Sequence, residues 1–196
     1  APVGTAQPIL ERFVHEKRFW IYKKLAEKDA LRSPKVSKEF VNGEGFPYLG
    51  RSYRLLLVDD QDEPIKLIKG RFRLRRSDVP QAKTCFITWY IDHARPWIAH
   101  RISEHADRLG KQPTGLEVRD LGFRWGSCGK SGGLNFHWAT ILLPPSIVEY
   151  VVVHELVHLL EPNHTPEFWT RIERVMPDYE TRKEWLAENG AGYLAL

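Results

Sequence analysis

The chain has 196 residues and 42% hydrophobic content, enough to bury one substantial core. Its only cysteines, Cys85 and Cys128, exclude a disulfide framework and suit a cytoplasmic setting. No run reaches the roughly 18 to 20 apolar residues of a membrane helix, and the N-terminus lacks a signal-peptide pattern. We therefore expect a soluble cytoplasmic protein with no membrane partner.

The first part of the sequence predicts a helix, a polar stretch and two strands. Residues 8–27 place apolar side chains at helical spacing, which favours an amphipathic helix. Residues 28–44 are polar. Strands are expected over Tyr53–Val58 and Ile65–Leu74, joined by the acidic turn 59–63.

The next part predicts a long helix followed by strands. The helical pattern over 84–109 ends at Gly110, and Pro96 should kink or divide it. Beyond it the sequence predicts a strand over Leu116–Trp125, a loop over 126–133 and a second strand over Leu134–Trp138. These elements lead into an apolar run, Ile147–Leu160, with the pattern of a buried helix.

Residues 154–158 of this run read His-Glu-Leu-Val-His. Histidines four positions apart lie on one helix face, so His154 and His158 can reach one metal ion with Glu155 beside it. Zinc with three protein ligands keeps a position for water, lowering its pKa to about 7, and a neighbouring carboxylate can take the proton. Because burying these groups unpartnered would be costly, the segment indicates a metal site.

A third ligand is predicted at His164, ten residues after His154. Pro162 and Asn163 should stop the helix and turn the chain, and the spacing matches HExxHxxGxxH sites except that Glu161 replaces the turn glycine. Glu161 is itself a competing candidate for the ligand, as are glutamates of the following helix, such as Glu173 and Glu180. Five histidines lack such spacing and are expected at surface or helix positions: His15, His93, His100, His105 and His137.

The C-terminal region predicts two further helices. Thr165-Pro166-Glu167 has the pattern of a helix N-terminus, with a cap, a proline and an acid in the first turn. Pro177-Asp178 restarts the helical pattern, and Asn189-Gly190 ends it. Three short helices should therefore enclose the metal.

Several ordered motifs carry a family resemblance: Phe123-Arg-Trp-Gly-Ser-Cys128, Leu134-Asn-Phe-His-Trp138, Pro144-Pro145, Tyr150–His158, Asn163-His164-Thr165, Phe168-Trp169 and Pro177-Asp178-Tyr179. With them the chain resembles the YgjP-like metal-dependent hydrolases, which are related to the SprT and WLM zinc peptidases. The resemblance implies a zincin-type fold with His154, His158 and His164 as ligands and Glu155 as the base. It leaves the substrate open.

Compared with that family, the chain has less strand sequence at its start and lacks an initiator Met, so we expect it to begin part-way. His137 stands where the family more often has asparagine. The expected fold class is α+β, a zincin-like core of a small mixed sheet, the HExxH helix and C-terminal helices. We expect an N-terminal helical and basic strand region over 1–115, the catalytic core over 116–196, and one compact unit.

Substrate is expected beside the strand that precedes the loop. In zincin-like sites an extended peptide can add a strand to a sheet edge next to the metal. Arg124, Trp125, Gly126 and Ser127 are the candidates for this edge, although Trp125 and Gly126 also suit a core aromatic and a turn. Arg124 or Tyr150 could also stabilise an oxyanion, although Tyr150 equally suits a buried helix position.

Charge is uneven along the chain. Residues 1–130 carry net +9 and residues 131–196 net −5, within a total of +4. Lys69, Arg71, Arg73 and Arg75 alternate, which would place them on one face of a strand. The stripe over residues 66–76 could bind phosphates of a nucleotide or nucleic acid, or be a solvated strand face.

Three functions follow from these patterns. The first is a zinc peptidase that acts on peptides or unfolded proteins. The second is a metal-dependent nucleotide phosphohydrolase that uses Arg71 and Arg73 for phosphate charge. The third is a non-catalytic nucleic-acid-binding or protein-binding module with structural zinc, which would need a closed, four-ligand site. Histidine ligands would also suit Ni²⁺ or Co²⁺.

Overall fold

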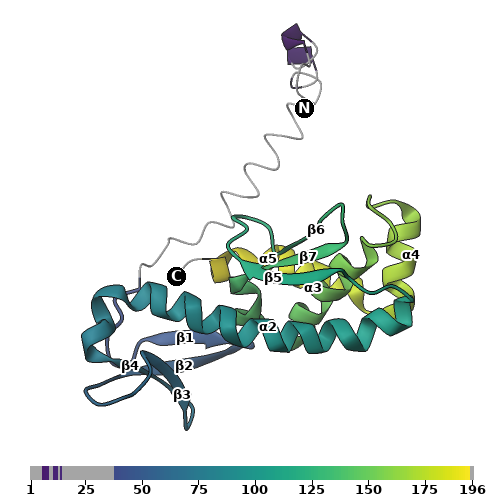
Figure 1. Ribbon diagram of the computed structural model, residues 1–196. Helices are drawn as coiled ribbons and strands as arrows, with labels where there is room; N and C mark the ends of the chain where they lie inside the picture. The colour runs from purple at the N-terminus through teal and green to yellow at the C-terminus, as the bar shows by residue number, and fades with distance from the viewer. Residues whose placement is uncertain (1–5, 9–10, 13, 15–37, 195–196) are drawn as a thin grey trace. The chain divides into compact units, whose positions relative to one another are not determined.

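The computed structural model describes residues 6–8, 11–12, 14 and 38–194 (Figure 1). The chain divides into two units, Ala1–Val36 and Ser37–Leu196. The helix predicted over 8–27 falls almost entirely outside the described residues. The fold described below is that of the second unit, which is of the α+β class.

A four-stranded mixed sheet forms the first part of this unit. Its strands are β1 (Gly45–Tyr48), β2 (Arg51–Val58), β3 (Ile65–Ile68) and β4 (Arg71–Arg75), in the order β1-β2-β4-β3. β2 runs parallel to β4, and the two outer strands are antiparallel to their neighbours. The strand predicted at Tyr53–Val58 is confirmed as part of β2, whereas β1 was not predicted.

The single strand predicted over Ile65–Leu74 is wrong, because the chain folds there into the β3–β4 hairpin. Lys69 and Gly70 form its two-residue turn with φ angles of 48° and 73°. A two-residue turn with positive φ at both positions has the twist that a β-hairpin needs. Such turns usually contain Asn-Gly or Asp-Gly, so the Lys-Gly sequence did not indicate a hairpin here. Lys69 therefore lies in the turn and not on the strand face with Arg71.

Helix α2 (Ala82–Leu109) joins the two halves of the unit. Gly110 ends it in the left-handed conformation, with φ of 66°, as predicted. The predicted division at Pro96 does not occur. Pro96 lies on an exposed side of the helix, where the carbonyl group that it leaves without a partner, that of Asp92, can be solvated.

Beyond α2 lies a second, three-stranded sheet. Its strands are β5 (Gly115–Arg119), β6 (Gly126–Cys128) and β7 (Gly133–His137), in the order β5-β7-β6. β5 is parallel to β7, and β6 is antiparallel to it, so β6 is an edge strand. The strand predicted over Leu116–Trp125 ends at Arg119, and the predicted loop 126–133 begins with β6. Pairing with β7 makes this three-residue segment a strand.

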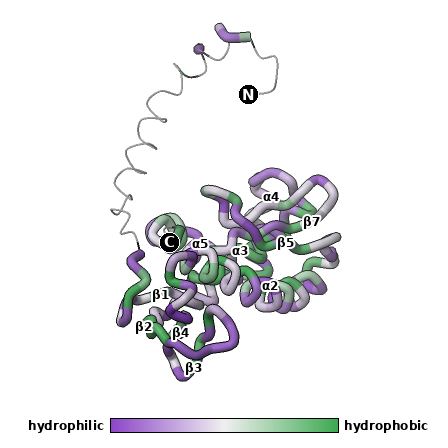
Figure 2. The backbone as a smooth tube through the Cα atoms, turned by 60° about the vertical axis from the view of Figure 1, so that its left-hand side comes forward, coloured by the Kyte–Doolittle hydropathy of each residue, from purple (hydrophilic) through white to green (hydrophobic). Residues whose placement is uncertain are grey.

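Three helices follow, as predicted: α3 (Pro145–Val157), α4 (Pro166–Val175) and α5 (Tyr179–Asn189). α3 contacts α2, α4, α5 and β6, and Figure 2 shows it as a hydrophobic segment. It is buried on nearly all sides, which explains why its sequence lacks a polar face. The α-helix α5 ends at Asn189, next to the predicted end at Gly190. The chain then continues as a 3-10 helix over Gly190–Leu194.

One hydrophobic core runs through the unit and includes residues from both sheets and all the helices. Phe46 and Phe72 of the first sheet pack against Phe86 of α2, with ring centroids 4.1 Å and 5.2 Å away. Residues of α3 and β7 belong to the same cluster. The core thus fixes α3 against both α2 and the small sheet. The domain boundary expected between residues 115 and 116 stays a prediction.

Candidate metal and catalytic site

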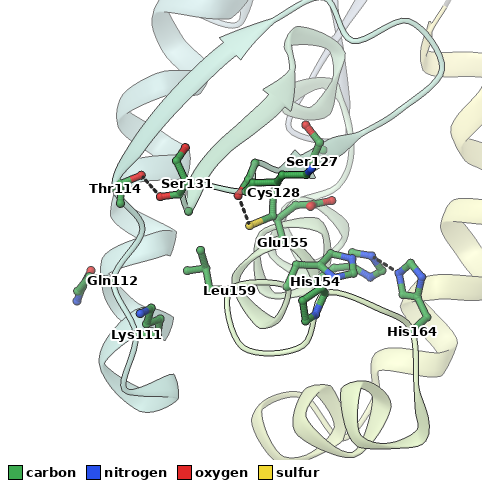
Figure 3. A pocket seen from close by; sticks show the side chains of 16 residues that line it. Lys111, Gln112, Thr114, Ser127, Cys128, Ser131, His154, Glu155, Leu159 and His164 are labelled. Atoms are coloured by element: carbon green, nitrogen blue, oxygen red, sulfur yellow. Dashed lines mark hydrogen bonds between the residues drawn. The ribbon is translucent and has the colours of Figure 1, made fainter. Parts of the chain in front are cut away.

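Three histidines meet at one point of the structure. His154 lies in the last turn of α3, His158 caps that helix, and His164 comes from the loop before α4 (Figure 3). Their potential ligand atoms all lie within 4.8 Å of one another. Across the described chain, no fourth His, Cys, Asp or Glu joins this group.

The local fold that gathers them starts at the end of α3. The helix stops at Val157, earlier than the predicted stop before Pro162, and tightens into i,i+3 hydrogen bonds, with the Leu160 amide donating to the Val157 carbonyl at 2.9 Å. Thr165 then caps α4 by accepting a hydrogen bond from the Phe168 amide. The short loop between the two helices holds His164 opposite His154.

Hydrogen bonding sets the tautomer of His158. Its Nδ1 lies 3.0 Å from the backbone oxygen of Glu161. A carbonyl can only accept, so Nδ1 carries a proton, and in the neutral ring the free lone pair is then on Nε2. Metal-binding histidines commonly have such a partner, which orients the ring.

The other two rings face each other. Nε2 of His154 lies 3.0 Å from Nε2 of His164. Burial, followed by the neighbouring His158 and His164, lowers the pKa of His154 to about 3. Burial and His158 also lower the pKa of His164. The rings are therefore neutral at pH 7, the form in which imidazole binds metals.

Glu161, the competing candidate for the third ligand, is engaged elsewhere. Its carboxylate accepts a hydrogen bond from Nε of Arg171 at 3.3 Å. Glu173 and Glu180 are also absent from the described group around His154. The structure therefore gives His164 as the third member.

Glu155 is buried beside the histidines, with 6% of its surface exposed. Figure 3 shows it between His154 and the residues of β6. Burial raises the pKa of Glu155 to about 8, and the positive charge of Arg124 opposes this rise. A cation held by the histidines would favour the ionised form, in which the carboxylate can accept a proton.

Gly126 of β6 makes the close packing of Glu155 possible. A Cβ atom at this position would lie 2.6 Å from Cγ and 2.7 Å from Oε1 of Glu155. The glycine therefore serves as a contact surface for the carboxylate. Its sequence context predicted a sheet-edge residue or a turn, and no local pattern signals a contact with a residue 29 positions later.

A pocket of about 710 Å³ opens in front of these groups. The three histidines and Glu155 line it together with Gly126, Ser127 and Cys128 of the edge strand. Lys111 and Lys130 also line it, and they form no ion pair within the described chain. The sequence did not indicate either lysine, because both lie in loops far along the chain from the HExxH motif and at no characteristic distance from it.

The substrate residues predicted before β6 have different environments. Gly126 and Ser127 line the pocket, and Arg124 is exposed in the preceding loop. Trp125 is partly buried, and its backbone oxygen accepts hydrogen bonds from the His137 amide and the Thr140 hydroxyl. Its backbone thus anchors the start of the edge strand.

The basic residues Arg71 and Arg73 are not brought to this pocket, because they lie on β4 of the other sheet. The expectation for His137 is also wrong. It is neither at the surface nor in a helix but buried at the end of β7, where its Nδ1 accepts from the Ala139 amide at 3.0 Å. Nε2, which then carries the proton, faces Asp120 at 3.3 Å.

The chemistry of the site fits a transition-metal ion. The donor set is three imidazoles, and tetrahedral coordination with bonds of roughly 2.0 to 2.1 Å is compatible with nitrogens this close together. The site also keeps one side open to the pocket.

A known protein family matches most of the sequence. The sequence model of the YgjP-like metallopeptidase domain matches residues 1–189. The chain belongs to the YgjP-like family. This membership supports a metal-dependent hydrolase with a zincin-like core.

One solved structure similar to this YgjP-like chain is the metallopeptidase zymogen of Pyrococcus abyssi abylysin. It is 27% identical, with a TM-score of 0.41, and the match covers 44% of this chain and 86% of that one. No curated protein matches significantly. Among the described residues, no helix combines the length and apolar character needed to cross a membrane.

Proposed function

We propose that this YgjP-like chain is a zinc-dependent peptidase with His154, His158 and His164 as ligands and Glu155 as the general base. One observation carries the proposal: three imidazoles converge beside a buried carboxylate at a pocket bordered by an edge strand. Bound zinc would supply Lewis acidity and an activated water. Ni²⁺ or Co²⁺ would suit the same ligands.

The residues of the chain divide the remaining work. Glu155 takes the proton of the attacking water and delivers it to the leaving amine. The free edge of β6 pairs with an extended peptide through backbone hydrogen bonds, which makes an unfolded protein or flexible peptide the substrate class. We assign to Arg124, whose charge acts on Glu155, the stabilisation of negative charge that develops nearby.

A nucleotide phosphohydrolase is the second candidate, and Lys111 and Lys130 favour it because they put positive charge into the pocket. Phosphate recognition would then depend on these lysines, not on the predicted Arg71 and Arg73. Replacing both lysines by Ala should abolish nucleotide hydrolysis if this second function is correct, while replacing both arginines should not.

A non-catalytic role with structural zinc is disfavoured by the open pocket and the three-member donor set. The two free cysteines, Cys85 and Cys128, support a cytoplasmic setting for this enzyme.

The test is Glu155→Gln, which keeps size and polarity but removes the base. Metal content and thermal stability should be retained, while cleavage of an unfolded protein falls by about 100-fold or more, the scale of general-base catalysis. Glu167→Gln, at an exposed glutamate of α4, is the matched control and should keep full activity. Unchanged proteolysis by Glu155→Gln would overturn the proposed mechanism.

A further inference from the structure

The outer face of the four-stranded sheet carries a compact group of cations. Strand register places Arg54 beside Arg71 and places Arg73 between Leu56 and Lys66. Residues of β2 and β4 that alternate with these positions, including Leu55, Phe72 and Leu74, are buried in the core. The three arginines therefore point to the side of the sheet opposite the core.

This side is uncovered in the described chain. The core side packs on α2, where Phe72 contacts Phe86, Trp89 and Tyr90. In Figure 1, α2 lies over one face of β1, β2 and β4, and no described helix lies over the other. Arg54 and Arg71 are exposed on this face, whereas Arg73 is partly buried.

Ion pairs neutralise some of the neighbouring cations. Lys66 pairs with Asp62 at 2.5 Å. At the other end of β4, Arg75 pairs with Asp78 at 2.6 Å and Arg76 with Asp59 at 2.8 Å. The stripe predicted over residues 66–76 is therefore not uniformly free, and half of its expected charge is compensated within the fold.

The remaining group, Arg54, Arg71 and Arg73, has no acidic partner among the described residues; we call it the arginine trio. Arg54 donates one hydrogen bond to the Gly43 carbonyl at 2.7 Å. Arg71 is exposed. Arg73 is partly buried, and its Nε is a buried donor without a hydrogen-bond partner.

A hollow of about 440 Å³ adjoins the arginine trio. Arg54 and Arg71 line it together with Asn42, Gly43 and residues of β2. Two guanidinium groups beside a recess present the forked donors that match phosphate oxygens.

We propose that the arginine trio binds the phosphate backbone of duplex nucleic acid. Protein–DNA interfaces are strongly positive, whereas the cores of protein–protein interfaces are depleted of charge and rich in aromatic residues. The described outer-face positions of β2, β3 and β4 hold no aromatic side chain, so the face lacks the stacking platform of single-strand binders. Contacts to phosphates alone predict binding without sequence preference.

The test measures binding of the full chain to a labelled DNA duplex of arbitrary sequence as salt is varied. Three phosphate contacts predict a slope of about −2.7 in log affinity against log salt, or a loss of roughly forty-fold between about 50 and 200 mM. Arg71→Ala/Arg73→Ala should reduce the slope magnitude by about 1.8. Arg54→Ala/Arg71→Ala, at two exposed residues, gives the same readout if loss of Arg73 impairs folding.

The matched control is Arg76→Ala, which removes one exposed but ion-paired arginine from the same segment. It should leave the slope unchanged. The proposal is overturned if no duplex binding occurs, if the arginine variants bind like the wild type, or if Arg76→Ala weakens binding as much as Arg71→Ala. A single-stranded probe that binds more tightly than the duplex would also overturn it. None of these outcomes depends on hydrolase activity.

Discussion

Gly126 and Glu155 are in direct contact, although they come from different elements, the edge strand β6 and helix α3. Any side chain at position 126 would enter the space of the Glu155 carboxylate, since a Cβ atom would lie 2.7 Å from Oε1. The carboxylate is thus positioned by the absence of a side chain opposite it.

We expect Gly126→Ala to displace Glu155 and lower peptidase activity by at least about tenfold, with a loss of about 1 to 3 kcal/mol of stability from overpacking. Steady-state kinetics, metal content and denaturant unfolding would measure these effects. Gly115→Ala is the control, because a Cβ at this position in β5 meets nothing within 4 Å. Equal activity in the two variants would show that Glu155 does not require its present position.

The third ligand can be tested by comparing His164→Ala with Glu161→Gln. His164 is exposed, and the ion pair of Glu161 with Arg171 is partly exposed to solvent, so neither substitution should unfold the protein. We expect His164→Ala to weaken zinc binding by more than about 100-fold, beyond the effect of losing an outer-shell partner. Glu161→Gln should retain it. Metal titration against a competing chelator is the measurement, and the reverse order would make Glu161 the ligand.

Zinc should stabilise the fold because the ligands come from α3, its C-terminal cap and the following loop. At a free zinc concentration of 100 times the Kd, mass action adds about 2.7 kcal/mol. For a chain of this size that corresponds to an increase in Tm of roughly 5 to 10 °C. Calorimetry with zinc and with a chelator would measure it. His154→Ala should show no such difference, and a wild type that melts identically in both would contradict a preformed zinc site.

Stability should also decline in acid because of Glu149. Burial raises its pKa, but hydrogen bonds from Arg182 and His105 outweigh burial and lower the pKa below its ordinary 4.5. A depressed carboxyl pKa contributes stability above the unfolded value, and this contribution is lost as pH falls through the folded value. Urea unfolding from pH 6 down to about 3 should thus show a steeper decline for wild type than for Glu149→Gln. Parallel profiles would show that Glu149 does not contribute.

Local sequence was sufficient where each residue acts within its own helix or turn. The spacing of His154 and His158 places both on one helix face, Thr165 and Pro166 begin α4, and Gly110 ends α2. The apolar run around Glu155 predicted a buried helix for the same reason, since burial on all sides leaves no polar face.

Tertiary structure decided the features that join distant segments. Pairing with β7 makes β6 a strand, and packing on α3 makes Gly126 the contact surface of Glu155. Ion pairs with Asp62, Asp78 and Asp59 neutralise Lys66, Arg75 and Arg76 of the basic stretch, and strand pairing brings Arg54 beside the unpaired Arg71. The sequence by itself determined which groups can perform the chemistry, through helical periodicity and capping. Which surfaces face those groups depended on long-range packing, which no local pattern encodes.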